Sequence, residues 1–436
     1  MEMKTMGTKL FTGLCFMTLT CMNFASVGHT ILFSGEVRLR PEYRDNADFS
    51  KDTADTLSFI GSRLRLSAAA KASDDVLVKL TFQDTRNWGS VSPVGLTDAG
   101  EAVDIHEGYA EISNFFKTPV TLRAGRQEMF YGDQRLIGHF GWSNQGRAFD
   151  ALKLLFSNGD YALDAWLAKR KENNGTAASP NIDRDFYGLY GTLKTLVPNA
   201  AWEMYVLFDR EGDTAANARK KAFFTVGSRI AGKISGVDYS LELPYQFGDN
   251  GTRVAKSSED VKIDAYAIAS KLGYTFPGES AVRVGGEFTF ASGDDNSGDA
   301  TSRTFNNLYP TNHLHYGYMD YQGWRNMIGL NANVSGNLME KKIFLSGKYW
   351  NFRLADAKDG WYDAAGNAAG TARSASAAGS DRDVGNEINL LARYTYNTQV
   401  MLEAGWGYFF RGDMIKKKVT SSGDSDWAYL IMTVKF

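Results

Sequence analysis

The sequence predicts an all-β protein: a transmembrane antiparallel up-and-down β-barrel of about 18 strands, with short periplasmic turns and long extracellular loops. Three observations lead to this prediction. Segments of about ten residues alternate between apolar and polar side chains through most of the chain. The connections between these segments alternate between short and long. Beyond the N-terminus no window is apolar over 18 residues, which excludes membrane-spanning helices.

The composition agrees with a barrel and excludes other classes. The chain has 436 residues, with 44 Gly and only 8 Pro, and it contains 27 Phe, 21 Tyr and 9 Trp. Its 48 basic and 50 acidic residues nearly balance, which excludes a nucleic-acid-binding protein that relies on net positive charge. A hydrophobic content of 43% excludes a disordered acidic chain.

The only long apolar stretch is at the N-terminus, where Lys4 and Lys9 precede an apolar run over residues 10–24. The small residues 25–28 follow, and this order of segments is typical of a secretory signal peptide. We expect residues 1–28 to be the signal peptide and residues 29–436 to be one barrel domain. A membrane anchor is the alternative for the first segment. Both cysteines, Cys15 and Cys21, lie within it, so the mature domain has neither disulfides nor thiol chemistry.

The clearest alternating segment begins at Val237. Leu241 belongs to its apolar face and Glu242 to its polar face, and neighbouring strand residues point to opposite sides of a sheet. We therefore expect Leu241 to face lipid and Glu242 to face the lumen. A soluble β-sandwich also alternates, but these segments are long and one face carries charge in strand after strand. The last segment ends on Phe436, and a terminal aromatic residue resembles the signal read by the outer-membrane assembly machinery.

The predicted strands cover most of the chain in order. They lie near residues 31–44, 57–70, 76–87, 103–113, 119–130, 147–157, 160–171, 184–193, 200–210, 221–233, 236–248, 260–274, 280–291, 323–335, 341–354, 384–396, 399–411 and 426–436. Nine long loops and eight short turns join them. Long loops include 88–102, 131–146, 292–322 and 355–383, and short turns include 73–75 and 158–159. An even strand number with this alternation of loop lengths is the rule for outer-membrane barrels.

A barrel of about 16–18 strands encloses an aqueous channel, so its inward residues determine what passes. Arg38 and Arg40 lie on the strand next to Arg63 and Arg65, and together we expect them to form a basic wall. Guanidinium groups offer paired donors to carboxylates, and charged walls select ion sign in pores. Other predicted inward bases are Lys79, Arg123, Lys153, Arg229, Arg283, Lys348 and Arg393. The alternative is that these bases pair with inward acids, among which we expect Glu36, Glu107, Glu111, Asp164, Asp264 and Glu403.

No catalytic motif is present, and we predict no enzyme, no cofactor and no metal centre. The histidine pair His313 and His315 has no third ligand in view. The acidic run 294–299 lacks the spacing and the closing Glu of a calcium loop. Divalent cations shared with lipopolysaccharide phosphates are a further interpretation of the acidic loops, and a merely solvated outer surface is the simpler one.

Two stretches resemble the alginate-export family of outer-membrane porins. The first covers Arg123-Ala124-Gly125-Arg126-Gln127, then residues 131–138 and 142–147, and ends at Phe149-Asp150. The second includes Ser292-Gly293-Asp294, Leu308-Tyr309-Pro310-Thr311 and His313. The resemblance covers residues 33–436. It implies an 18-stranded monomer with an arginine-rich constriction that passes a uronate polymer. Its best matches to pore-facing positions are Arg123, Arg126, Arg135 and Arg147, although alternation places Arg126 opposite Arg123.

The leading functional hypothesis is a passive channel of the bacterial outer membrane with anion preference, similar to porins that export alginate-like polysaccharide. The alternative is a general small-solute uptake porin with weak selectivity. The predicted pore-lining residues are Arg38, Arg40, Arg63, Arg65, Arg123, Arg126, Arg135, Arg147, Arg283 and Arg393. The expected partners are anionic polysaccharide or small anions, outer-membrane lipid and lipopolysaccharide, and the assembly machinery. The sequence leaves the substrate, its direction and the gating loops open.

Overall fold

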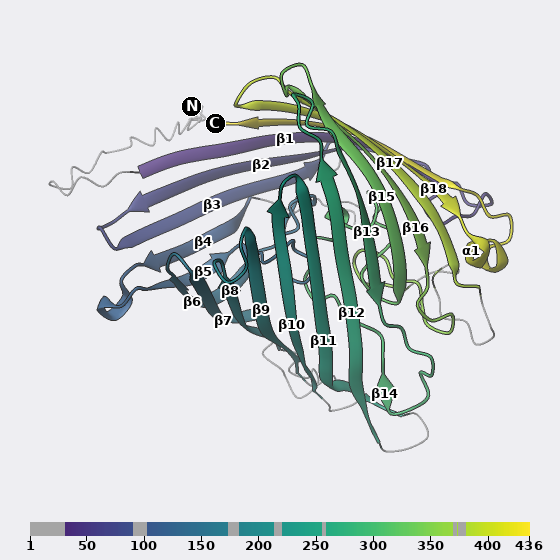
Figure 1. Ribbon diagram of the computed structural model, residues 1–436, viewed down its shortest axis with the longest axis horizontal. Coiled ribbons are helices and arrows are strands. Elements are labelled where there is room, and N and C mark those ends of the chain that lie inside the picture. The colour runs from purple at the N-terminus through teal and green to yellow at the C-terminus, as the bar shows by residue number, and fades with distance from the viewer. Residues whose placement is uncertain are drawn as a thin grey trace, which may run out of the picture.

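The computed structural model describes residues 31–89, 103–172, 183–212, 220–254, 259–368, 373 and 381–436. Within them a single sheet closes on itself as an 18-stranded antiparallel barrel, because β1 (Ile31–Asp45) pairs with both β2 (Leu57–Lys71) and β19 (Ser425–Lys435) (Figure 1). The predicted all-β barrel is confirmed. The signal-peptide prediction falls on residues outside the described part of the chain.

The remaining barrel strands follow in sequence order around the wall. They are β3 (Val76–Asn87), β4 (Asp104–Ile112), β5 (Val120–Gln127), β6 (Phe149–Ser157), β7 (Tyr161–Lys171), β8 (Arg184–Leu193), β9 (Ala200–Glu211), β10 (Lys221–Ile234), β11 (Val237–Arg253), β12 (Asp260–Thr275), β13 (Arg283–Ala291), β15 (Met327–Leu338), β16 (Ile343–Arg353), β17 (Asp383–Thr395) and β18 (Val400–Arg411). Most predicted boundaries lie within three residues of these.

Two small elements were not predicted, and both belong to loops. The two-residue strand β14 (Thr301–Ser302) pairs in parallel with β12, and the short helix α1 (Asp413–Lys418) lies between β18 and β19. Two 3-10 turns, η1 (Phe115–Lys117) and η2 (Asn312–Leu314), complete the structure. Within the described residues, no helix is both long and apolar enough to cross a membrane.

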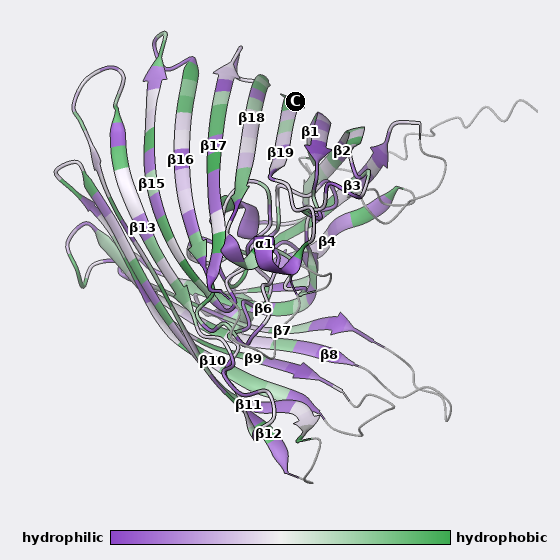
Figure 2. Ribbon diagram, turned by 90° about the vertical axis from the view of Figure 1, so that its right-hand side faces the viewer, coloured by the Kyte–Doolittle hydropathy of each residue, from purple (hydrophilic) through white to green (hydrophobic). Residues whose placement is uncertain are grey.

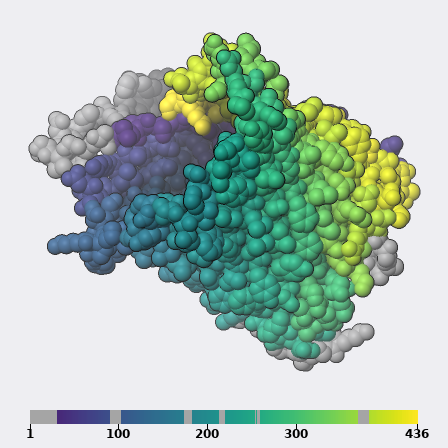
Figure 3. Space-filling view, viewed as in Figure 1, coloured from purple at the N-terminus to yellow at the C-terminus, as the bar shows by residue number. Residues whose placement is uncertain are grey.

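The outer surface is apolar because alternate strand residues point away from the lumen. Leu241 is 38% exposed on the outside, whereas the next residue, Glu242, is 6% exposed on the inside. The same alternation continues from strand to strand, and the outer wall over β10–β15 is continuous in the space-filling view (Figure 3). The predicted directions of Leu241 and Glu242 are therefore right. Glu242 does not face open water, however, because the lumen beside it is filled.

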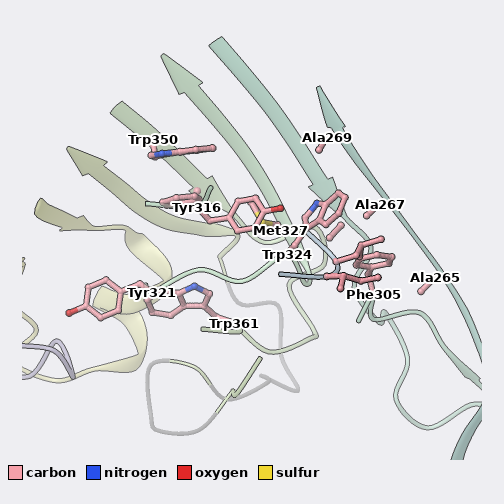
Figure 4. Close-up of a cluster of buried hydrophobic side chains, with 14 of the residues drawn as sticks. Ala265, Ala267, Ala269, Phe305, Tyr316, Tyr321, Trp324, Met327, Trp350 and Trp361 are labelled. Atoms are coloured by element: carbon pink, nitrogen blue, oxygen red, sulfur yellow. The ribbon is translucent and has the colours of Figure 1, made fainter. Parts of the chain in front are cut away.

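Three long loops fold into the barrel and fill much of its interior (Figure 2). We call them L3 (residues 128–148), L7 (residues 292–326) and L8, of which residues 354–368, 373 and 381–382 are described. Aromatic side chains from these loops pack on the inner wall, as Figure 4 shows for Phe305 and Trp324 of L7 and Trp361 of L8. The inner face of β12 carries only small side chains there. Ala265, Ala267 and Ala269 leave room for the loop side chains.

Candidate functional site: the lumen and its inward-folded loops

The predicted basic wall exists, but its arginines hold loop L3. Arg38 donates through Nη1 to the carbonyl oxygen of Gly141 at 2.8 Å. Through Nη2 it donates to the Trp142 and Ser143 carbonyl oxygens, both at 2.9 Å, and to Asn144 Oδ1 at 2.5 Å. Arg38 is only 6% exposed. Its guanidinium is therefore occupied by the loop instead of facing passing solute.

Arg40 and Arg63 complete this clamp on L3. Arg40 donates to the Trp142 carbonyl oxygen at 2.5 Å and to Glu42 at 2.6 Å. Arg63 donates to the Ser143 carbonyl oxygen at 3.2 Å and pairs with Glu36. Both arginines are buried. We call Arg38, Arg40 and Arg63 the arginine clamp, because all three reach the same segment of L3 from β1 and β2.

Arg65 anchors the start of L3 by a different contact. It donates to Gln83 at 2.7 Å and to Glu128 at 3.1 Å, and His106 lies 2.7 Å from the same Glu128 oxygen. Burial alone would raise the pKa of Glu128, but the His106 hydrogen bond and the Arg65 charge outweigh it and lower this pKa to about 2. Glu128 is thus held as a carboxylate at the root of the loop.

The middle of L3 carries a further ion cluster around the buried Arg135. Arg135 is 2% exposed and pairs with Glu287 of β13 at 2.5 Å and with the Tyr316 hydroxyl of L7 at 2.7 Å. Asp133 faces three cations, with Lys271 at 2.7 Å, Arg229 at 3.4 Å and Arg135 at 3.6 Å. Burial raises the pKa of Asp133, yet these cations hold it well below its usual range.

Loops L3 and L7 are joined by backbone pairing. Tyr309 donates to the Leu136 carbonyl oxygen at 2.9 Å and accepts from the Gly138 amide at 2.8 Å. Arg147 adds bonds to the carbonyl oxygens of Gly138 at 3.1 Å and Pro310 at 2.8 Å. Burial and the nearby Arg170 lower the pKa of Arg147 to about 10. Arg135 and Arg147 therefore lie inside the barrel as expected, but they tie loops together.

Most of the other predicted lumen bases form ion pairs with acids on the barrel wall. Arg123 pairs with Glu111 at 2.6 Å, Arg283 with Asp238 at 2.6 Å, and Arg393 with Glu403 at 2.6 Å. Lys79 lies 2.5 Å from Glu107, and Lys153 lies 2.9 Å from Asp164. Pairing of inward bases with inward acids, the alternative weighed from the sequence, describes this part of the lumen.

Arg126 does not line the pore, although it was among the predicted pore-lining residues. It alternates with the inward residue Gln127 and pairs with the exposed Asp150 of β6 at 3.2 Å, so it lies on the outer face of the barrel. The register of β5 with β6 is regular at this point, and no bulge turns Arg126 inward. Asp264 is a second correction: it faces outward and accepts a hydrogen bond from the Tyr245 hydroxyl at 2.9 Å.

A stack of rings runs through the lumen from β1 to β16, and only the folded chain reveals it. Arg40 lies 4.3 Å over the ring of Trp142, which stacks on His313 at 3.9 Å between ring centroids. His313 stacks on Tyr318 at 5.4 Å, and the Lys348 ammonium of β16 lies 4.6 Å over that ring. Within the described part of the chain, no carboxylate forms an ion pair with Lys348.

The three aspartates of the acidic run of L7 share one arginine of the same loop, Arg303. Arg303 lies 3.1 Å from Asp299, 3.4 Å from Asp295 and 3.9 Å from Asp294. Among the described residues there is no group of three or more His, Cys, Asp or Glu side chains arranged to hold a metal ion. The positive charge beside these carboxylates is therefore the Arg303 guanidinium.

Comparisons with known proteins agree on family and fold. The model of the alginate export family matches residues 30–429. Three solved structures from Pseudomonas aeruginosa are similar over 93% of this chain: OccK8 (OprE), OpdO, and OpdK with vanillate. Their TM-scores are 0.58, 0.60 and 0.58, their identities 12%, 12% and 10%, and 98%, 97% and 98% of each is covered. Identities this low establish the fold alone.

A search of the curated proteins found no match. The family model nevertheless spans nearly the whole chain, and the barrel is that of the outer-membrane porins. Its long loops and short turns give the orientation expected of an integral outer-membrane barrel. The protein is an outer-membrane channel, and the chain belongs to the alginate export family.

Proposed function

We propose that the channel is passive, prefers anions and carries an anionic polysaccharide of the uronate type. The observation that carries this proposal is the unequal exposure within two of the lumen ion pairs, Arg393–Glu403 and Lys79–Glu107. The Arg393 side chain is 42% exposed and its partner Glu403 is 8% exposed, and Lys79 is 30% exposed against 12% for Glu107. Water in the lumen therefore meets the cation of these pairs more than the carboxylate.

Lys348 strengthens the same preference. Its ammonium lies over the Tyr318 ring, and in the described residues it has no acidic partner. A cation held by an aromatic ring keeps its charge for a passing carboxylate. Contacts of this kind are individually weak, which suits transport, because a solute that binds tightly does not leave.

The proposed channel works as a monomer and without an enzymatic step. Support for a monomer is the complete closure of the sheet by β1 and β19, which leaves no barrel edge for a partner. Support for a passive channel comes from the family and from the use of the buried lumen carboxylates and guanidinium groups in ion pairs and loop contacts. Such paired groups stabilise the loops.

Uptake of small solutes is a second candidate, and one specific observation favours it. L3 and L7 are bonded to each other across the interior, and the ring stack from Arg40 to Lys348 lies across the same space. A lumen divided in this way suits short anions better than a long chain. The three similar solved structures support the fold of this alternative, and one of them was determined with vanillate.

Planar-bilayer recordings distinguish the two candidates. In a salt gradient we expect a reversal potential of anionic sign, and we expect oligouronate to reduce the conductance. Lys348→Met and Arg393→Gln should each move the reversal potential toward zero. Arg126→Gln removes the same charge from the outer face and serves as the matched control, with no change expected. Block by small monocarboxylates without block by oligouronate would favour uptake, and cation selectivity of the native channel would contradict both readings.

A further inference from the structure

The register of eight adjacent strands aligns outward-facing charges of alternating sign in one row. Arg126 of β5 lies opposite Asp150 of β6, which lies opposite Lys169 of β7. The row continues through Asp185 of β8 and Arg210 of β9. After Ala222 of β10, it ends with Asp249 of β11 and Lys262 of β12. We call this row the charge ladder; strands β5–β12 lie side by side in Figure 1.

The charges of the ladder form ion pairs, and all of them except the buried Asp185 remain partly accessible. Lys169 lies 3.0 Å from Asp185, which also lies 3.3 Å from Arg210, and Asp249 pairs with Lys262. The most exposed side chains of the ladder are Asp150 at 59% and Lys262 at 60%, and the end residue Arg126 is 39% exposed. The ladder thus presents both signs of charge to its surroundings, at positions fixed by the sheet.

A row of outward-facing aromatic side chains lies next to the ladder, on the side away from the long loops. This row indicates the depth of the ladder in the membrane. Tyr187, Phe208, Phe224 and Phe247 face outward on β8–β11, opposite one another in register and two residues from the ladder. Their ring centroids are 6.0, 4.5 and 5.5 Å apart in sequence order. Two residues of strand span about 7 Å. Aromatic girdles mark the membrane interface of barrels, so the charges begin where the apolar band ends.

The ladder also lies at the end of the strands that carries the long loops. Arg126 is two residues before L3, and Asp150 is two residues after it. Long loops are extracellular in outer-membrane barrels, so this interface belongs to the outer leaflet. That leaflet is built of phosphorylated glycolipid, whose phosphates are bridged by divalent cations. Its head groups therefore present both signs of charge at the depth of the ladder.

From these observations, we propose that the ladder on β5–β12 is a docking surface for the phosphorylated head group of the outer-leaflet glycolipid. The ladder cations pair with its phosphates, the ladder carboxylates share its divalent cations, and the aromatic row packs on its acyl chains. At the loop ends of β13–β17 the outward row is less charged, since Phe290 and Ile328 lie in register with one arginine and one aspartate, Arg353 and Asp383. The glycolipid is therefore expected on one side of the barrel.

The test uses the full-length protein in detergent with purified lipopolysaccharide. The measured quantities are the rise in melting temperature and the glycolipid retained in native mass spectrometry. Arg126→Gln/Lys262→Gln should lose most of both, because it removes the two end cations. Asp150→Asn/Asp249→Asn should keep binding but make it insensitive to EDTA. Arg353→Gln, an exposed arginine outside the ladder, is the matched control and should behave as the native protein.

Dephosphorylated lipopolysaccharide should give the native protein little stabilisation. Heat-modifiable gel mobility verifies that each variant is folded. Equal stabilisation by phosphorylated and dephosphorylated glycolipid, or native-like binding by both ladder variants, would overturn the proposal and leave only cross-strand pairing. A ladder variant that changes the oligomeric state instead would overturn it in favour of contact with a second protein copy.

Discussion

Release of L3 from the arginine clamp is the sharpest test of how this lumen works. Arg38→Gln removes a guanidinium that donates to three backbone carbonyls and one side-chain oxygen of L3. A hydrogen bond from a charged donor contributes about 1.5–3 kcal/mol, but bonds that act as a unit do not add. Water in the lumen and the remaining clamp residues replace part of the loss. We therefore expect the four hydrogen bonds together to stabilise the bound position of L3 by about 3 kcal/mol. Their loss should raise the displaced fraction of the loop about a hundredfold.

A thiol reports this displacement directly. The chain has no cysteine beyond residue 21, and Ser143, whose carbonyl is held by the clamp, is 3% exposed. In a Ser143→Cys background, Arg38→Gln should speed labelling by a water-soluble thiol reagent about a hundredfold. Bilayer recordings of the same variant should show more frequent conductance steps.

Arg393→Gln is the matched control, because it removes one lumen arginine that pairs with Glu403 and not with L3. It should shift the reversal potential without changing the labelling rate. Equal labelling of Ser143→Cys in the Arg38→Gln and Arg393→Gln backgrounds would refute the clamp. Neutralising the whole predicted basic wall should therefore change conductance steps more than ion selectivity.

Three further predictions follow from the geometry. Leu241→Arg places a charge on the lipid face and should cost about 2–4 kcal/mol of folding free energy near the bilayer midplane, measured by urea titration in lipid vesicles. Glu242→Gln keeps an acceptor for the Tyr205 hydroxyl at 2.9 Å and should cost under about 1 kcal/mol, so equal losses would contradict the register. Asp133→Asn leaves three cations near one neutral side chain and should cost about 3–5 kcal/mol, whereas a native melting temperature would show that these charges are well solvated. The pKa of Glu128 is lowered from 4.5 to about 2, so its contribution to stability is complete above the pKa of the unfolded chain and is lost as the pH falls toward 2. Conductance steps should therefore increase at pH 3. Glu128→Gln should show the increased steps already at pH 7.

The wall of the barrel could be predicted from the sequence because one rule governs most of it. A strand between lipid and water must alternate, and the segment around Leu241 does so except at Pro244, which lies on the inner face. The rule is reversed along β12, where Ala265 and Ala267 face inward and Asp264 faces outward. The reason is that L7 covers the inner face of β12, so that face is dry. Alternation shows which residues share a face, but it does not reveal which face a loop will cover.

The candidate site was harder to predict because its contacts link distant parts of the chain. Arg38 lies more than a hundred residues from the L3 carbonyl oxygens that it holds. An inward arginine on a strand looks the same in the sequence whether it meets solute or a loop backbone. Family resemblance wrongly placed Arg126 in the pore, whereas alternation placed it outside. The ring stack through Trp142 and His313 has no sequence signal, since both residues lie in loops outside the alternating strands.

Closure of the barrel by its first and last strands also governs when the protein can form. Glu36 lies opposite Lys435, so the seam joins residues from the two ends of the chain. Contacts of such large sequence separation form slowly, and until then β1 and β19 each expose an unpaired edge that can join another chain. The clamp on L3 depends on β1 as well, so the loop acquires its anchors only once that strand is in place. A nascent chain of this protein therefore needs a chaperone that shields both edges until its last residues arrive.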